Sequence, residues 1–137
     1  MSHRLVLDAS AAIAWASPDE APPAALASAM ANGGCVAPAL WMHEVHNVLL
    51  MLQRRKRIDG EGHAAACAAL EALDVEVEPP AWGLVAHEVS RLARAHALTI
   101  YDAAYLELAM RRRLPLATFD AALRKAADAE GVALVPS

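Results

Sequence analysis

The sequence predicts an α/β fold in which a central, mainly parallel sheet is covered by helices on both faces. Short apolar runs alternate with longer, alanine-rich segments along the whole chain, a pattern typical of parallel strands connected by helices. The 137 residues are 57% hydrophobic but only 4% aromatic, and small apolar side chains favour helices packed closely against a flat surface. The length suits a single domain over residues 1–137, because folding at this size buries roughly two-thirds of the unfolded surface.

Five segments are predicted to be strands. The first is the apolar run that ends before Asp8, and the third alternates acidic and apolar residues with a period of two before Pro79. The expected strands are residues 4–7, 35–37, 74–78, 114–119 and 132–135.

The segments between the strands are predicted to be helices. In the strongest of them, residues 39–57, an apolar arc contains Glu44, whereas His43 and His46 fall on the opposite side. The arc consists of Trp41, Val45, Val48, Leu49 and Leu52. The other expected helices are residues 9–16, 24–31, 61–73, 81–96, a segment that begins at Thr99, and residues 120–130.

Two of these helices carry expectations about individual side chains. Trp82 is expected among the apolar positions of an amphipathic helix. In the helix that begins at Thr99, the spacing Thr99-x-x-Asp102 is that of a capping box, and Asp102 lies on the buried face. Farther along that helix, Glu107 and Arg111 are expected to form an ion pair turned to solvent.

Charge and cysteine content argue against several classes of function. The formal net charge of −4 disfavours a sequence-independent nucleic-acid binder, which is normally basic, although a divalent cation can supply local positive charge to a nuclease. Cys35 and Cys67 form no CxxC pair, so neither a zinc site nor a disulfide framework is expected, and a cytoplasmic location fits best. Asp8 interrupts the apolar start, which argues against export, and no apolar run is long enough to predict a membrane span.

Four acidic residues are the candidates for chemistry. Asp8 and Asp120 each follow a predicted strand and precede a helix, where Asp is a preferred N-cap, and Asp102 fits the capping box. Capping cannot explain Glu44, which lies about one turn into its helix and points toward the core side. A salt bridge at the rim of the apolar arc is the alternative explanation for Glu44.

Considered together, the four acids predict a metal site. Ligands of parallel α/β sheets bind outside the carboxyl ends of the strands, where Asp8 and Asp120 are predicted, and Asp102 begins a helix on its core-facing side. Converging carboxylates without matching cations would repel one another. Oxygen-rich sites of this kind suit Mg²⁺ or Mn²⁺, which can activate water and stabilise charge on a phosphodiester.

Short segments around these acids match known motifs. They are Leu7-Asp8-Ala9-Ser10-Ala11, Glu44-Val45-x-Asn47-Val48-Leu49, Tyr101-Asp102-Ala103-Ala104-Tyr105-Leu106 and Leu116-Ala117-Thr118-Phe119-Asp120. They resemble the four motifs of PIN-domain ribonucleases, and in particular of the small VapC-type toxins of bacterial toxin–antitoxin pairs. The combination of YDAAYLELA with PLATFD is specific, whereas residues 18–31 match the family poorly.

The resemblance implies a PIN-like three-layer sandwich in which about seven helices flank a five-stranded sheet. It implies the activity of a Mg²⁺- or Mn²⁺-dependent endoribonuclease that hydrolyses RNA with a metal-activated water. The implied catalytic and metal-binding quartet is Asp8, Glu44, Asp102 and Asp120. Within it, Asp8 and Asp102 would be the most direct metal ligands, and the other two would complete the site directly or through water.

The resemblance also implies supporting residues and partners. Thr118 and Ser10 match positions near the site that orient a carboxylate or a water by hydrogen bonding. The implied partners are an RNA substrate and a cognate antitoxin protein, and self-association as a homodimer is expected by analogy.

Three other functions are weighed against this one. A catalytically silent PIN-like module that binds a protein partner is the main alternative, and the intact quartet argues against it. A phosphoacceptor domain is disfavoured because Val6 and Leu7 stand where an acidic pair should precede the acceptor Asp8. A zinc-protease helix needs histidines at i and i+4, whereas His43 and His46 are at i and i+3.

Two surface features have open explanations. The basic runs at residues 54–57 and 111–113 either complement helix C-termini or line an RNA path. The apolar arc of the 39–57 helix is expected to be core, and part of it, with residues 24–31, is a candidate groove for an antitoxin helix.

Overall fold

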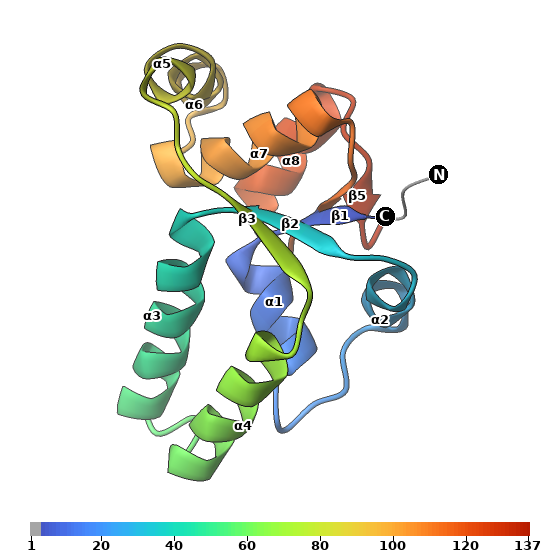
Figure 1. Cartoon of the computed structure of the whole chain (residues 1–137), viewed down its shortest axis with the longest axis vertical. Helices are drawn as coiled ribbons and strands as arrows, with labels where there is room; N and C mark the ends of the chain where they lie inside the picture. Colours follow the sequence, from blue (N-terminus) through green and yellow to red (C-terminus); the bar gives the residue numbers. More distant parts are fainter. Residues whose placement is uncertain (1–3) are drawn as a thin grey trace.

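The computed structural model describes residues 4–137 and contains a five-stranded sheet in which all neighbouring strands are parallel (Figure 1). The strand order is β3-β2-β1-β4-β5. The strands are β1 Leu5–Leu7, β2 Cys35–Pro38, β3 Val75–Glu78, β4 Leu116–Ala117 and β5 Leu134–Val135. The predicted α/β class is therefore confirmed, and each expected strand is present, although the bounds of all five differ from the expected ones.

Helices cover the sheet on two sides, with α1, α3 and α4 on one side and α7 and α8 on the other (Figure 1). Their bounds are α1 Ala9–Ala16, α2 Ala24–Ala31, α3 Leu40–Arg54, α4 Gly60–Glu71, α5 Trp82–Leu84, the π-helical turn η1 Val85–Val89, α6 Ser90–His96, α7 Ile100–Arg112 and α8 Ala121–Ala129. Because α5, η1 and α6 follow one another without a break, the described chain has seven helical segments, as expected.

The core lies between the sheet and its two helical layers. Every residue of β1 is buried, which is why this strand is a continuous apolar run rather than an alternating one. On α3, Trp41, Val45 and Leu49 are buried, as the apolar arc predicted. On the other side of the sheet, α7 contributes Leu106 to the same core.

The order of the strands creates a switch point between β1 and β4. The chain runs outward from β1 through β2 to β3, and then crosses to β4 and β5 on the other side of β1. The helix after β1, α1, packs against α3 and α4, whereas the helix after β4, α8, packs against α7. The two helices thus leave adjacent strands toward opposite faces, and in open α/β sheets ligands bind in the crevice outside such strand ends.

The prediction for Trp82 was wrong in part. The segment expected as one helix is continuous but contains the π-helical turn η1, where the Ser90 hydroxyl donates a hydrogen bond to the Val85 carbonyl at 2.8 Å. Trp82, at the start of this segment, is 91% exposed. The buried residues of the segment come later, at Val89, Leu92 and Ala93. This helical segment lies away from the sheet (Figure 1) and packs against α7 through η1 and α6.

The expectation that Glu107 and Arg111 turn to solvent was also wrong in part. The ion pair exists, with Arg111 Nε donating to a Glu107 oxygen at 2.8 Å, but Glu107 is only 6% exposed. Arg111 also binds Glu78 at the end of β3, so the pair lies against the sheet edge. In residues 4–137, no helix has the length and apolar character needed to cross a membrane.

Candidate functional site

Asp8 and Asp120 lie at the carboxyl ends of the adjacent strands β1 and β4, at the switch point. Asp8 caps α1, with its Oδ1 accepting a hydrogen bond from the Ala11 backbone N–H at 3.0 Å. Asp120 caps α8, with its Oδ2 accepting from the Leu123 backbone N–H at 2.9 Å. The capping roles predicted for both residues are confirmed. Each carboxylate still has an oxygen that its own helix does not use.

Two hydroxyl groups hold the Asp8 carboxylate. Thr118, which is fully buried, donates to Oδ2 at 2.6 Å, and Ser10 donates to Oδ1 at 2.7 Å. The same hydroxyl oxygens accept from the backbone after β4, Thr118 from the Asp120 N–H at 3.0 Å and Ser10 from the Phe119 N–H at 2.9 Å. The segment after β4 is therefore bonded to the start of α1, and Asp8 has a defined orientation.

Asp102 lies in the first turn of α7, as predicted. The Thr99 hydroxyl oxygen accepts from the Asp102 backbone N–H at 3.0 Å, which is one half of the expected capping box. The Asp102 side chain is half-buried. Burial raises the pKa of its carboxyl, and the nearby carboxylates of Asp120 and Asp8 raise it further.

Glu44 enters the site from the second turn of α3 and is half-buried. Its Oε1 accepts a hydrogen bond from the hydroxyl of Tyr105, a residue of α7 that is only 1% exposed. Burial and the hydrogen bond to Glu44 raise the pKa of Tyr105, which keeps the phenol protonated as a donor. The group that contacts Glu44 is thus a neutral phenol, rather than the cation that a rim salt bridge requires.

Tyr105 is the functional candidate that sequence reasoning missed. A buried tyrosine usually has a partner for its hydroxyl, and Tyr105 follows Asp102 by one turn on the face that α7 turns to the core. The feature that could have identified Tyr105 from the sequence was therefore a tyrosine hydroxyl on a buried helical face, close to a candidate acid. The partner itself comes from α3, far away in the sequence.

The four acids influence one another electrostatically. Burial raises the pKa of Asp8, with Asp120 adding to the rise, and it raises the pKa of Glu44, with Asp102 and Asp8 adding to it. No arginine or lysine lowers the pKa of Asp8, Glu44 or Asp102. The fold therefore brings the predicted quartet within electrostatic range at one place, where none of these three has a compensating cation from the described chain.

The comparison with known families decides the fold family. The profile of the PIN domain matches residues 5–129, which is most of the chain. The chain belongs to the PIN domain family.

Solved structures with the same fold include three from well-separated organisms. PAE2754 from Pyrobaculum aerophilum has 26% sequence identity and a TM-score of 0.71, and the match covers 97% of this chain and 84% of that one. Mycobacterium tuberculosis VapC20, a toxin that cleaves the sarcin–ricin loop, has 18% identity and a TM-score of 0.64, covering 89% of this chain and 94% of that one. A toxin–antitoxin complex from Klebsiella pneumoniae has 15% identity and a TM-score of 0.56, covering 85% and 86%. No curated protein gives a significant match.

The donor atoms of this PIN domain suit a hard divalent cation. The candidate ligands are carboxylate oxygens without sulfur or imidazole. Burial, with a smaller contribution from neighbouring carboxylates, raises the pKa of Asp8, Glu44 and Asp102. Within residues 4–137, no three His, Cys, Asp or Glu side chains are grouped closely enough to hold a metal ion in the arrangement described. Like-charge repulsion opposes such a close grouping until a cation lies between the carboxylates.

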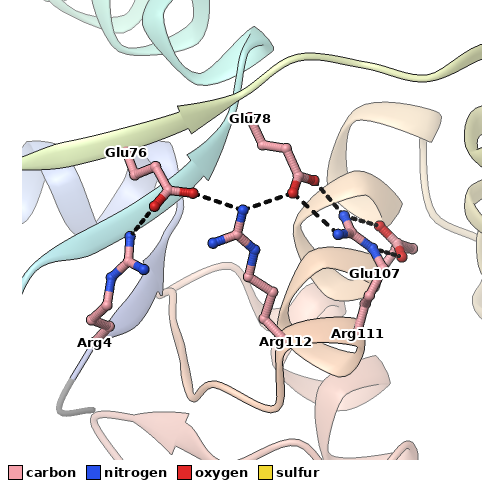
Figure 2. Close-up of polar contacts among 6 residues, drawn as sticks. All are labelled: Arg4, Glu76, Glu78, Glu107, Arg111 and Arg112. Carbon is pink, nitrogen blue, oxygen red and sulfur yellow. Dashed lines mark hydrogen bonds and ion pairs between the residues drawn. The ribbon is translucent and has the colours of Figure 1, made fainter.

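The basic residues at the end of α7 have partners of their own (Figure 2). Arg112 binds Glu76 at 2.7 Å and Glu78 at 2.8 Å, and Arg111 binds Glu78 and Glu107. Arg111 and Arg112 therefore tie α7 to β3, a role that neither of the two explanations offered for the run at residues 111–113 had included. The run at residues 54–57 is exposed.

The histidines next to Glu44 lie outside the site. His43 and His46 are exposed on the outer side of α3, whereas Glu44 turns inward to Tyr105. The predicted placement of Glu44 and the two histidines on opposite sides of this helix is confirmed.

Proposed function

We propose that this PIN domain is a Mg²⁺- or Mn²⁺-dependent endoribonuclease, and that it acts as the toxin of a toxin–antitoxin pair. One observation carries the proposal. Asp8, Glu44 and Asp102 are buried or half-buried at the switch point, and burial and neighbouring carboxylates raise the pKa of each one. Burial and mutual repulsion of these carboxylates destabilise the folded state, and a bound divalent cation would offset that destabilisation.

The similar structures support the toxin assignment. VapC20 is described as a toxin that cleaves the sarcin–ricin loop, and the Klebsiella pneumoniae structure is a toxin–antitoxin complex. By analogy, the substrate of this chain is an RNA and its partner is a small antitoxin protein. The family resemblance adds self-association as a homodimer.

Each acid has a proposed role. Asp8 and Asp102 would bind the cation directly, and Glu44 and Asp120 would complete the site directly or through water. When bound, the cation supplies a water of lowered pKa and neutralises charge on the phosphodiester. In the net reaction, water oxygen bonds to phosphorus, the P–O3′ bond breaks, and the products carry a 5′-phosphate and a 3′-hydroxyl.

The chain's own neutral donors position these acids. Thr118 and Ser10 fix both oxygens of Asp8, and Tyr105 fixes one oxygen of Glu44. Preorganised ligands of this kind need no rotamer search when the cation and substrate arrive. The remaining acid, Asp120, is exposed, and one of its oxygens caps α8.

The test is cleavage of RNA by the purified chain in Mg²⁺. We expect cleavage by the wild type, its loss on adding a chelator, and a fall in rate of about 100-fold or more for Asp8→Asn and for Asp102→Asn. Asp128→Asn on the exposed side of α8 is the matched control and should cleave normally. Cleavage at the wild-type rate by the Asp8 and Asp102 variants would refute the site assignment.

A catalytically silent protein-binding module is the second candidate. The observation in its favour is that no three of the described acids are already grouped to hold a metal ion. Titration calorimetry with Mn²⁺ separates the two functions. A nuclease releases or absorbs heat as Mn²⁺ binds, and Asp8→Asn weakens this binding, whereas a silent module needs no metal.

A further inference from the structure

The carboxyl edge of the sheet has a second feature beside the acids, an apolar cavity of about 220 Å³. It lies beyond the ends of β2 and β3, between the chain that leaves β3 and the first turns of α7. Its walls include Pro38, Leu40, Pro80, Leu84, Tyr101 and Ala104. The acids Asp8 and Asp120 lie at the ends of β1 and β4. The same edge of the sheet therefore has carboxylates at the ends of β1 and β4 and an apolar cavity at the ends of β2 and β3.

The walls of the cavity continue directly into the acid cluster. On α3, Leu40 in the wall precedes Glu44 by one helical turn, so both lie on the same face of the helix. On α7, Tyr101 in the wall is followed at once by Asp102, and Tyr105 lies one turn further along the same face. A ligand that places one group at the acids can therefore place a neighbouring group in the cavity.

The cavity suits a flat, uncharged group. Tyr101 is 62% exposed, which leaves its ring available for stacking. Glu78 and Glu107 also line the cavity, but both bind Arg111, so their charges are compensated (Figure 2). The volume is below the roughly 300–1,000 Å³ of sites for drug-sized ligands, which points to a fragment such as one heterocyclic base.

We propose that this cavity binds one unpaired base of a single-stranded RNA, next to the phosphate that lies at the acids, and that Tyr101 stacks on this base. The inference rests on the proposed ribonuclease function and adds a specificity-determining site to it. Proteins that bind single-stranded RNA commonly stack splayed bases on aromatic rings. A base is favoured over a protein side chain because the cavity adjoins the acid cluster through Leu40 and Tyr101.

Two variants test the cavity, one that removes the ring and one that fills the space. For Tyr101→Leu and for Ala104→Met we expect KM for a short single-stranded RNA to rise by about 5- to 100-fold, with little change in kcat. We also expect a weaker base preference at one position beside the cleavage site when an RNA of varied sequence is digested. Mn²⁺ affinity, measured by calorimetry, should stay unchanged in both variants.

Trp82→Leu is the matched control, because Trp82 is an exposed aromatic residue of α5 that does not line the cavity. It should leave KM and base preference unchanged. Unchanged KM and base preference in both cavity variants would overturn the inference while leaving the ribonuclease function intact. An altered oligomeric mass without a change in KM would also overturn it, since the cavity would then be a protein contact.

Binding separates this inference from the proposed function. Fluorescence anisotropy of the same labelled oligonucleotide reports affinity whether or not the wild type cleaves it. Loss of affinity in Tyr101→Leu supports the cavity even if the wild type cleaves nothing. Equal affinity in the wild type and Tyr101→Leu counts against the cavity even if the wild type cleaves RNA.

Discussion

Two groups of acidic side chains in this PIN domain have opposite electrostatic surroundings. At the switch point, burial and neighbouring carboxylates raise the pKa of Asp8 and Glu44. Along β3, hydrogen bonds from Arg112 and Arg4 lower the pKa of Glu76, and hydrogen bonds from Arg111 and Arg112 lower the pKa of Glu78 to about 2. Residues of the same type thus differ according to whether the chain supplies their counter-ions.

The difference separates a structural role from a functional one. In the network of Figure 2, Arg4, just before β1, and two arginines of α7 bind three glutamates, so the charges are balanced within the fold. The members are Arg4, Glu76, Glu78, Glu107, Arg111 and Arg112. At the switch point the donors are neutral hydroxyl and backbone groups, which orient carboxylates without neutralising them. Such a cluster has a physical reason to bind an external cation, whereas the network has none.

The largest expected effect is on cleavage. Glu44→Gln keeps a hydrogen-bond acceptor for Tyr105 but removes a charge from the cluster, and we expect the rate of RNA cleavage to fall about 100-fold. Glu76→Gln removes a charge from the network and should leave the rate unchanged, as measured in parallel with the same RNA. Equal losses in the two variants would erase the distinction between the two groups.

The next effect is on stability. Arg111→Met leaves the buried Glu107 without its cation, and we expect a loss of about 2 kcal/mol in the free energy of unfolding by urea. Arg91→Met breaks the exposed pair with Glu88 and serves as the control, with no measurable change expected. A stable Arg111→Met protein would show that the network is not structural.

A smaller effect is expected from the neutral donor in the cluster. Tyr105→Phe removes the hydroxyl that holds Glu44 while keeping the ring in the core, and we expect Mn²⁺ affinity to fall about 10-fold in calorimetry. The urea midpoint of the same variant checks the fold. If Mn²⁺ affinity stays at the wild-type level, Tyr105 has only a packing role.

The smallest effect is the pH dependence of stability, whose sign differs between the two groups. The folded pKa of Glu78, about 2, lies below its ordinary 4.5, so its contribution is present above pH 4.5 and is lost as the pH falls toward 2. The folded pKa values of Asp8 and Glu44 are raised above 3.8 and 4.5, so their contribution is present below those values and is lost as the pH rises through the raised pKa.

Urea midpoints measured between pH 2 and neutral pH test these signs in metal-free protein. In Glu78→Gln, the urea midpoint should fall less steeply as the pH drops below 4.5. In Glu44→Gln, the midpoint should fall less as the pH rises toward neutral, and stability at neutral pH should increase by about 1 kcal/mol. Mn²⁺ should restore stability to the wild type at neutral pH, because it binds the deprotonated carboxylates of the folded state. If either variant keeps the wild-type pH dependence of the urea midpoint in its own pH range, the sign proposed for that residue is wrong.

Much of the fold and of the candidate site was predictable because it depends on local chemistry. The N-caps at Asp8, Thr99 and Asp120 each bond a backbone N–H only three residues ahead, so residue type and spacing were sufficient. The alternation of apolar runs and alanine-rich segments was enough to predict parallel strands covered by helices. The motifs around the acids were enough to identify the family.

The remaining features depend on partners that are distant in sequence. The hydrogen bond from Tyr105 to Glu44 and the ion pairs of Arg111 and Arg112 with Glu78 join residues of different elements, so no local pattern announces them. The burial of Glu107 and the 91% exposure of Trp82 likewise depend on which elements pack against α7 and α5, and not on the local pattern.

By itself, the sequence determined which residues are acids, which of them begin helices, and that the strands before Asp8 and Asp120 would be buried and parallel. Only the tertiary structure decided which acids receive cations from the chain and which do not. The reason is that a side chain's charge belongs to the residue, whereas its desolvation and its counter-ions come from whatever the fold packs against it.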